Sequence, residues 1–190
     1  ARALYPTILY PALRKLGNKL GRKPAPKTDY DYVRPTNLHE ALSILATPGR
    51  KAKLLSGGTD LQVGLRQGVY DTDLVIDIAD LPELRGIKIS DEKIAIGAAA
   101  TISEITEHNN ILKMQPMLAN GLARIATTQI RNVATIAGDL SQEKRCWFFR
   151  SGAQCYTAGG LACTCFEVLG GNRHLSILGA GRCAAPCVAD

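Results

Sequence analysis

A pair of glycines stands where an apolar stretch meets a second, helix-like stretch. The segment Leu54–Gly64 reads LLSGGTDLQVG, so that Ser56–Asp60 form the junction. A strand that turns into a helix through glycines leaves backbone N–H groups unpaired, and a phosphate can approach them because no β-carbon is in the way. Ser56–Asp60 is therefore a candidate pyrophosphate loop, although a purely structural tight turn explains Gly57 and Gly58 equally well. The segment lacks both the Gly-Lys-Ser/Thr of a P-loop and the Gly-x-Gly-x-x-Gly of a dinucleotide fingerprint.

A second stretch of the same kind lies further along the chain, at 129–142. It reads QIRNVATIAGDLSQ and again places small residues and polar capping residues at a junction. Two such loops could hold the two ends of a long nucleotide, because each would offer backbone N–H groups to a phosphate.

The cysteines form the other group of residues that could do chemistry. All six lie in the last 45 residues of the chain, at Cys146, Cys155, Cys163, Cys165, Cys183 and Cys187. A secreted domain stapled by disulfides would normally spread its cysteines along the chain, so this local cluster favours a metal or iron–sulfur site. Four thiolates suffice for a cubane cluster, and the absence of Cys-x-x-Cys argues against a zinc ribbon. Buried thiols, disulfides and a zinc site are the alternatives.

The elements expected to position these residues are short and alternate between strands and helices. Strands are predicted at 52–56 and 73–78, and a hairpin at 86–90 and 93–98. Capping boxes predict helices that start after Asn37 and after Thr101 (through about residue 108), and two more helices are expected at 60–68 and 116–126. Residues 21–35 are interpreted as a linker and 127–142 as a loop. The alternation predicts an α+β or α/β protein, and from Cys146 onward something other than a hydrophobic core must order the chain.

Composition narrows the class of protein. The chain has 190 residues, 46% of them hydrophobic, which is enough for one sizeable core or two small ones. Only 5% of the residues are aromatic, which argues against a stacking platform for nucleic acid. No apolar run reaches the roughly 18 residues of a membrane span.

The net charge of +6 belongs to the first part of the chain. Residues 1–28 hold seven basic side chains and no acidic one, whereas the remainder holds 16 basic and 17 acidic side chains. Leucines and isoleucines recur there at roughly helical spacing, interrupted by Pro6 and Pro11. This arm is expected to dock on a partner subunit. A membrane-surface helix, a tether and a nucleic-acid arm are the alternatives.

Four motifs carry a resemblance to a known family. LLSGGTDL (54–61), IGAAATISEI (96–105) and QIRNVATIAGDLSQ (129–142), in this order, resemble the FAD-binding subunit of the molybdenum hydroxylases, the relatives of xanthine dehydrogenase, carbon monoxide dehydrogenase and aldehyde oxidoreductase. YDYVRPTNLHEAL (30–42) is similar to the start of that domain. The resemblance implies an α+β FAD-binding fold of the vanillyl-alcohol oxidase and p-cresol methylhydroxylase type, with two α/β subdomains followed by a loop-rich cysteine segment.

The resemblance also implies a division of the chain. It gives a basic arm and linker at 1–29, the FAD-binding domain at 30–144 and an iron–sulfur segment at 145–190. The family's domain usually continues beyond this point, so its C-terminal part is expected to be missing from the chain, together with part of the flavin pocket.

The same resemblance assigns the cofactor-binding residues. In such proteins the Gly-Gly loop holds the FAD pyrophosphate, and the loop of the third motif contacts the flavin and its phosphates. Carried over, the FAD-binding residues are Leu55, Ser56, Gly57, Gly58, Thr59, Asp60, Leu61, Ala98, Thr101, Thr135, Ile136, Gly138 and Asp139. Ala137 replaces the first glycine of a usual pair, and its methyl group is accommodated if its φ is negative. Arg131 and Asn132 are expected to shape the loop.

The cysteine segment resembles a branch of the family that carries an extra 4Fe–4S cluster, as in 4-hydroxybenzoyl-CoA reductase. The carrying stretches are RCWFFRSGAQC (145–155), CFEVLGGN (165–172) and ILGAGRC (177–183). The implied cluster ligands are Cys146, Cys155, Cys165 and Cys183. Cys163 competes for the third position, and Cys187 stands where relatives often have a histidine. Trp147 and Phe148 are expected to shield the cluster, and His108 is expected on the surface of a helix.

The function implied is electron transfer, in which no side chain of this chain acts as acid or base. The expected partners are a molybdopterin-binding large subunit, a small subunit with 2Fe–2S clusters and an external electron acceptor, in the cytoplasm. A stand-alone FAD-dependent oxidoreductase and a non-catalytic metal-binding module are the alternatives.

Overall fold

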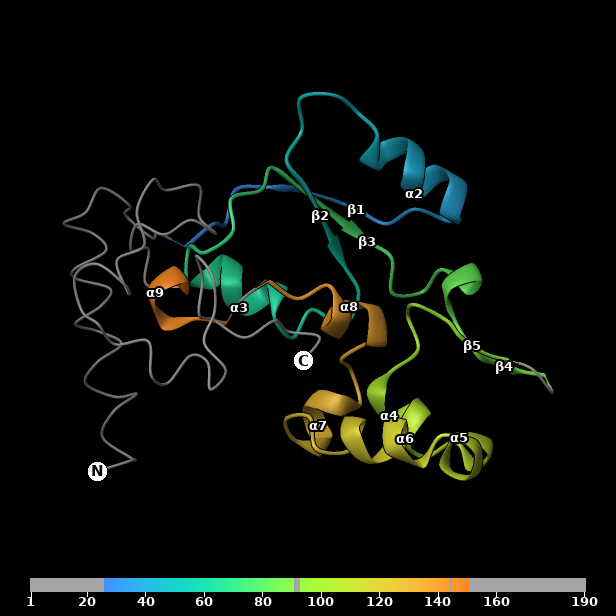
Figure 1. The fold of residues 1–190 in the computed structure, drawn as a ribbon. Coiled ribbons are helices and arrows are strands. Elements are labelled where there is room, and N and C mark those ends of the chain that lie inside the picture. Colours follow the sequence, from blue (N-terminus) through green and yellow to red (C-terminus); the bar gives the residue numbers. More distant parts are fainter. Residues whose placement is uncertain (1–25, 91–92, 144, 151–190) are drawn as a thin grey trace, which may run out of the picture. The chain divides into compact units, whose positions relative to one another are not determined.

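The structure is a computed structural model that describes residues 26–90, 93–143 and 145–150 (Figure 1). These residues fall into two compact units. The main unit comprises residues 29–62 and 72–141, and the second unit comprises the described parts of 1–28, 63–71 and 142–190.

A three-stranded parallel sheet forms the first half of the main unit. Its strands are β1 (Asp31–Val33), β2 (Ala52–Leu55) and β3 (Leu74–Asp77), in the spatial order β1-β3-β2. The central strand β3 has a partner strand on each side, and its apolar residues Leu74, Val75 and Ile76 are buried, whereas Asp77 at its end is half-buried. The predicted strand at 52–56 is confirmed, but Leu54 is 46% exposed because β2 lies at the sheet edge.

Helix α2 (Leu38–Leu45), which the sequence predicted, connects β1 to β2. Its N-cap Asn37 accepts a hydrogen bond from the Glu40 backbone N–H over 2.9 Å. The reciprocal half of the predicted capping box differs: the Glu40 carboxylate accepts instead from the backbone N–H and hydroxyl of Thr36, at 2.7 and 2.8 Å. A second carboxylate, that of Glu83, accepts from the Leu38 N–H at 3.1 Å, so the first turn of α2 is held by two acidic side chains.

A hairpin and a group of short helices complete the main unit. A 3-10 turn η1 (Pro82–Leu84) leads into strands β4 (Ile87–Ile89) and β5 (Ile94–Ile96), which pair in the predicted antiparallel hairpin. Helices α4 (Ile102–Thr106), α5 (Asn109–Met114) and α6 (Pro116–Leu122) follow and pack on one another, as Figure 1 shows. The core at this end of the unit consists of buried Ala100, Ile102, Ile105, Ile111, Ala119, Leu122 and Ala134.

Several sequence predictions need correction. The linker predicted at 21–35 contains β1, which forms because β3 offers it a partner. The loop predicted at 127–142 contains two short helices, α7 (Thr128–Arg131) and α8 (Ile136–Leu140). His108 does not lie on the exposed face of a helix: it precedes α5, and its Nδ1 is buried without a hydrogen-bond partner among the described residues. The helices predicted to reach about 108 and 126 end at Thr106 and Leu122.

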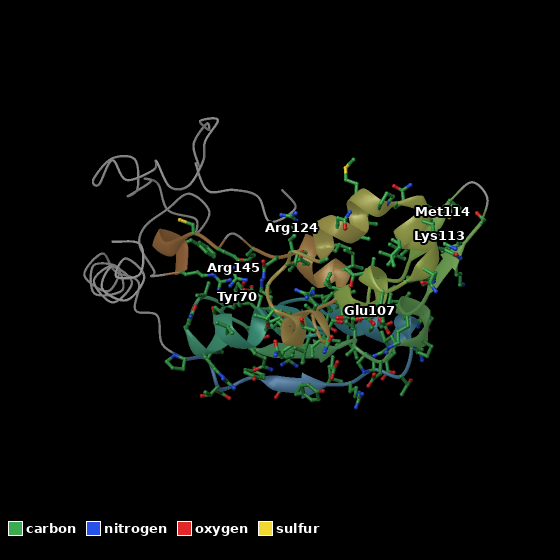
Figure 2. All side chains as sticks on the ribbon, turned by 90° about the horizontal axis from the view of Figure 1, so that it is seen from below. Tyr70, Glu107, Lys113, Met114, Arg124 and Arg145 are labelled. Carbon is green, nitrogen blue, oxygen red and sulfur yellow. The ribbon has the colours of Figure 1, made fainter. Side chains whose placement is uncertain are left out.

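The second unit contains most of α3 (Leu61–Arg66), the turn after it and α9 (Trp147–Arg150). The predicted helix end near Gly68 is confirmed, since Gly68 has a left-handed φ of +67°. Gly64 packs against the ring of Tyr70, whose side chain is labelled in Figure 2, and the Val69 N–H donates to the Gly64 carbonyl over 2.9 Å. In the part of the chain that the structure describes, no helix has the length and apolar character needed to cross a bilayer.

Candidate cofactor site

The first candidate loop leaves the carboxyl end of β2. Gly58 has a left-handed φ of +70°, and its carbonyl accepts the hydrogen bond from Gln62 that opens α3, at 3.1 Å. The backbone N–H groups of Gly57, Gly58 and Thr59 donate no hydrogen bond to any described residue. The loop therefore presents three consecutive open amides, at the edge of a parallel sheet where ligands of α/β proteins commonly bind.

Gly57 lies in direct backbone contact with the second candidate loop. A β-carbon at this position would come within 2.0 Å of the Val133 carbonyl oxygen and 3.0 Å of the Ala134 α-carbon. Only glycine allows two backbones to approach so closely. The tight-turn interpretation therefore accounts for both glycines. Gly58 adopts a left-handed φ, and Gly57 allows the close approach of the two backbones. This interpretation leaves the three open amides unexplained.

The second loop is joined in turn to the segment of the IGAAATISEI motif. Ile102 N–H donates to the Ala134 carbonyl at 2.9 Å and Ile136 N–H donates to the Ala100 carbonyl at 3.0 Å. Thr101 and Thr135 form an antiparallel bridge between these bonds. The motifs LLSGGTDL, IGAAATISEI and QIRNVATIAGDLSQ therefore meet at one place in the main unit.

Two hydroxyl groups at this meeting point have no hydrogen-bond partner among the residues that the structure describes. Ser56 Oγ and Thr135 Oγ1 are buried and make no hydrogen bond to any described residue. Thr135 is only 6% exposed, and a β-carbon on Gly138 would lie 3.0 Å from its hydroxyl. Because an unsatisfied buried hydroxyl is costly, these two groups fit a site completed by a polar ligand.

The residues assigned to FAD divide into three groups in space. The first group lies on β2, the loop and the start of α3: Leu55, Ser56, Gly57, Gly58, Thr59, Asp60 and Leu61. The second and third groups, Ala98 with Thr101 and Thr135 with Ile136, Gly138 and Asp139, are joined by the bridge. Thr101 has a structural task, since its Oγ1 accepts from the Glu104 N–H at 3.1 Å in the capping box that the sequence predicted.

The backbone at Ala137 has room for a methyl group, as the sequence required. Ala126 is the one described non-glycine residue with a positive φ, so φ of Ala137 is not in the left-handed region. Its N–H donates to the Ala98 carbonyl at 3.2 Å, inside the same joint. Alanine is therefore tolerated in place of glycine at this position.

The sequence predicted that Asn132 shapes the second loop, but it missed two of the groups that hold this loop in place. Val133 contributes only its carbonyl, which no side-chain pattern could reveal. Ser103 Oγ donates to Asn132 Oδ1 at 2.6 Å and ties α4 to the loop. The only sequence signal for this contact was the position of Ser103, one residue before the capping-box residue Glu104.

The cysteine cluster lies almost entirely outside the described residues. Cys146 is half-buried just before α9, and Cys155, Cys163, Cys165, Cys183 and Cys187 fall outside, as does the basic arm at 1–25. No group of three or more metal-ligating side chains occurs among the residues described. The assignment of Cys146, Cys155, Cys165 and Cys183 as ligands stays a prediction.

Comparison with known families agrees with this arrangement. Residues 28–165 match the family described as the FAD binding domain in molybdopterin dehydrogenase. The chain belongs to this family, and its parallel sheet, hairpin and helices confirm the α+β content that the sequence predicted.

Curated relatives come from several dehydrogenases. The chain is 38% identical over 112 residues to the 6-hydroxypseudooxynicotine dehydrogenase complex subunit alpha of Paenarthrobacter nicotinovorans, a match that covers 59% of this chain and 38% of that protein. It is 36% identical to the xanthine dehydrogenase FAD-binding subunit of Escherichia coli O157:H7, covering 57% and 37%. The chain thus spans less than half the length of these relatives.

Solved structures give the same result. Carbon monoxide dehydrogenase from Hydrogenophaga pseudoflava has a TM-score of 0.57 at 33% identity, and the match covers 60% of this chain and 39% of that chain. Quinoline 2-oxidoreductase from Pseudomonas putida 86 has a TM-score of 0.57 at 26% identity, over 60% and 40% of the two chains.

Proposed function

We propose that this chain binds FAD between its three motifs and serves as the electron-transfer subunit of a multi-subunit molybdenum hydroxylase. The observation that carries the proposal is that the open amides of Gly57–Thr59 lie beside the buried hydroxyls of Ser56 and Thr135, all of them without a hydrogen-bond partner within the described part of the chain. Membership of an FAD-binding family supports FAD as the ligand of this polar site. The proposed fold around it is of the vanillyl-alcohol oxidase type.

Different groups of the site would bind different parts of FAD. The open amides of Gly57, Gly58 and Thr59 would bind the anionic diphosphate, since N–H donors to a charged oxygen form strong hydrogen bonds. Ser56 and Thr135 would each donate or accept one further hydrogen bond. The flavin supplies the reversible uptake of electrons, and the protein supplies binding and orientation.

The partners follow from the relatives. Names such as "complex subunit alpha" and "medium chain" describe those proteins as parts of larger assemblies. We propose for this chain a molybdopterin-binding large subunit, a small subunit with 2Fe–2S clusters and an external electron acceptor. Substrate oxidation or reduction would take place on the large subunit.

The cysteine segment is proposed to hold a 4Fe–4S cluster on Cys146, Cys155, Cys165 and Cys183. Support comes from the gathering of all six cysteines in the last 45 residues and from the resemblance to the cluster-bearing branch. Reduced thiolates persist in the cytoplasm, which is the location we propose.

Titration with FAD tests the proposed function. The purified chain is freed of flavin, and binding is followed by quenching of FAD fluorescence. Saturable binding of one FAD per chain, with FMN much weaker, is expected because the diphosphate is the part that the open amides recognise. Equal affinity for FAD and FMN, or no binding of either, would contradict the proposal.

A further inference from the structure

The turn between α6 and α7 contains a backbone conformation that its residue type disfavours. Ala126 has φ of +45°, in the left-handed region, and no other described non-glycine residue has a positive φ. An L-residue with a β-carbon pays conformational energy to adopt it, so neighbouring groups must hold it there.

The group that holds this turn is the guanidinium of Arg131. Its Nη1 donates to the Ile125 carbonyl at 2.8 Å and to the Ala126 carbonyl at 3.5 Å. Its Nη2 donates to Thr128 Oγ1 at 3.1 Å. One planar group thus binds both the turn before α7 and the first residue of α7, which the single ammonium of a lysine cannot do in the same geometry.

The same residue lies in the second candidate loop, just before the segment that meets the first loop. Arg131 is the last residue of α7, and the N–H groups of Val133 and Ala134 both donate to the Ile130 carbonyl, at 3.1 and 2.7 Å. These bonds fix the direction of the Val133 carbonyl, which touches Gly57. A change in the turn at Ala126 would therefore move Val133 and Thr135 relative to the first loop.

We propose that Arg131 is a positioning residue for the cofactor: it holds the left-handed turn at Ala126 and so keeps Val133–Thr135 against the first loop. The inference rests on the proposed FAD site. It explains why the half-buried Arg131 donates its hydrogen bonds to a local turn, and why Ala126 can occupy a position suited to glycine. The expected consequence is that FAD affinity depends on Arg131, which does not itself contact the cofactor.

The test uses Arg131→Lys in the intact chain, with Arg124→Lys as matched control. Arg124 is an exposed arginine between α6 and α7, labelled in Figure 2, and its side chain makes no hydrogen bond or ion pair with any described residue. Arg131→Lys is expected to raise the Kd for FAD about tenfold, and Arg124→Lys is expected to leave it unchanged. Arg131→Lys should also change the visible circular dichroism of the bound flavin.

A second variant separates positioning from general destabilisation. Glycine adopts a left-handed φ without cost, so Arg131→Lys combined with Ala126→Gly should return the Kd to within about threefold of the wild-type value. Wild-type affinity in Arg131→Lys, or no recovery in the double variant, would overturn the inference. If circular dichroism shows Arg131→Lys to be unfolded, Thr128→Val replaces it, with a smaller rise of about threefold expected and an unchanged Kd overturning the inference.

Hydrogen exchange in the FAD-free chain distinguishes failure of this inference from failure of the proposed function. The Val133 and Ala134 amides should exchange about tenfold faster in Arg131→Lys than in wild type. A wild-type chain that binds no FAD refutes the proposed function. Faster exchange in the variant then still supports the positioning role, and unchanged exchange overturns it.

Discussion

The carbonyl oxygen of Val133 lies only 2.0 Å from the point that a β-carbon on residue 57 would occupy. Gly57 follows β2 and Val133 follows α7, so this contact joins two loops that are distant in sequence. It is made by backbone on both sides, and no side chain can rotate away to relieve it. The spacing between the two halves of the proposed cofactor site is therefore set by the absence of one β-carbon.

Substitution of Gly57 by alanine should break this joint. Val133 must move to make room, which is expected to lower the free energy of unfolding by about 1–3 kcal/mol, as other cases of overpacking do. FAD affinity should fall as well, because the open amides of the first loop shift away from Thr135. Thermal unfolding followed by circular dichroism and FAD titration measure the two effects.

Gly121→Ala is the control for this substitution. Gly121 lies in α6, and nothing comes within 4 Å of a β-carbon placed there. Alanine in a helix interior should raise the free energy of unfolding by about 0.5–1 kcal/mol and leave FAD binding unchanged. A Gly57→Ala chain as stable as wild type would show that the loops are not in the contact described.

The sequence predicted those elements whose signal is local. The strands predicted at 52–56 and 73–78 are present at Ala52–Leu55 and Leu74–Asp77. The hairpin and the capping box of Thr101 and Glu104 are present as predicted, since alternation and capping are properties of neighbouring residues. Helices α7 and α8 were missed because they have four and five residues, and short helices depend on tertiary bonds such as that of Ile136 to Ala100.

For the candidate site, the sequence predicted which loops take part but not how they contact each other. The motifs named its loops in the correct order, but the contact between the loops depends on the Val133 carbonyl, which no residue type reveals. Of the Ser103–Asn132 hydrogen bond, the sequence predicted only that Asn132 shapes the loop. The strand β1 was hidden in a stretch rich in proline, lysine and aspartate. It forms because Asp31–Val33 can pair with β3. Asp31 lies opposite Leu74, which is 43 positions further along the chain.

Thr135→Val should separate cofactor binding from stability. The Thr135 hydroxyl is buried without a described partner, so replacing it by a methyl group should leave the FAD-free chain as stable as wild type or slightly more stable. FAD affinity should fall by about tenfold, because the proposed ligand loses one hydrogen bond. Unfolding of the FAD-free chain and FAD titration give both quantities.

Thr72→Val is the matched comparison. The buried Thr72 hydroxyl bonds the Lys51 carbonyl and lies 2.9 Å from the Leu74 carbonyl. Its removal should lower the free energy of unfolding by about 1–3 kcal/mol. If Thr135→Val instead behaves like Thr72→Val and binds FAD with wild-type affinity, the Thr135 hydroxyl is not a cofactor ligand.

Stability at low pH should depend on Glu40. Hydrogen bonds from the backbone N–H and hydroxyl of Thr36 lower the pKa of this carboxyl below its ordinary value of 4.5. A lowered pKa in the folded state contributes stability that is fully present above pH 4.5 and is lost as the pH falls through the folded-state pKa. Glu40→Gln should therefore lower Tm at neutral pH, and the difference from wild type should shrink as the pH falls below the ordinary glutamate range.

Glu107→Gln serves as the control in this pH series. Glu107, labelled in Figure 2, is exposed at the end of α4, and its side chain makes no hydrogen bond or ion pair with the described residues. Its Tm should follow that of wild type throughout. A Glu40→Gln chain with the same Tm difference at every pH would mean that the carboxylate charge does not stabilise the first turn of α2.

Replacement of cysteines tests the proposed cluster independently of FAD. Cys146→Ser should lower the iron and acid-labile sulfide content per chain while FAD remains bound, because a serine hydroxyl replaces one of four thiolate ligands and the flavin loops lie elsewhere in the sequence. Iron analysis and the visible spectrum measure this.

Cys187→Ser, in the same segment but outside the proposed ligand set, should retain its iron. Comparing Cys163→Ser with Cys165→Ser identifies the third ligand, since only the true ligand should lose iron on substitution. Unchanged iron in Cys146→Ser would remove this residue from the set, whereas loss of FAD together with iron would mean that the cysteine segment also holds the flavin site together.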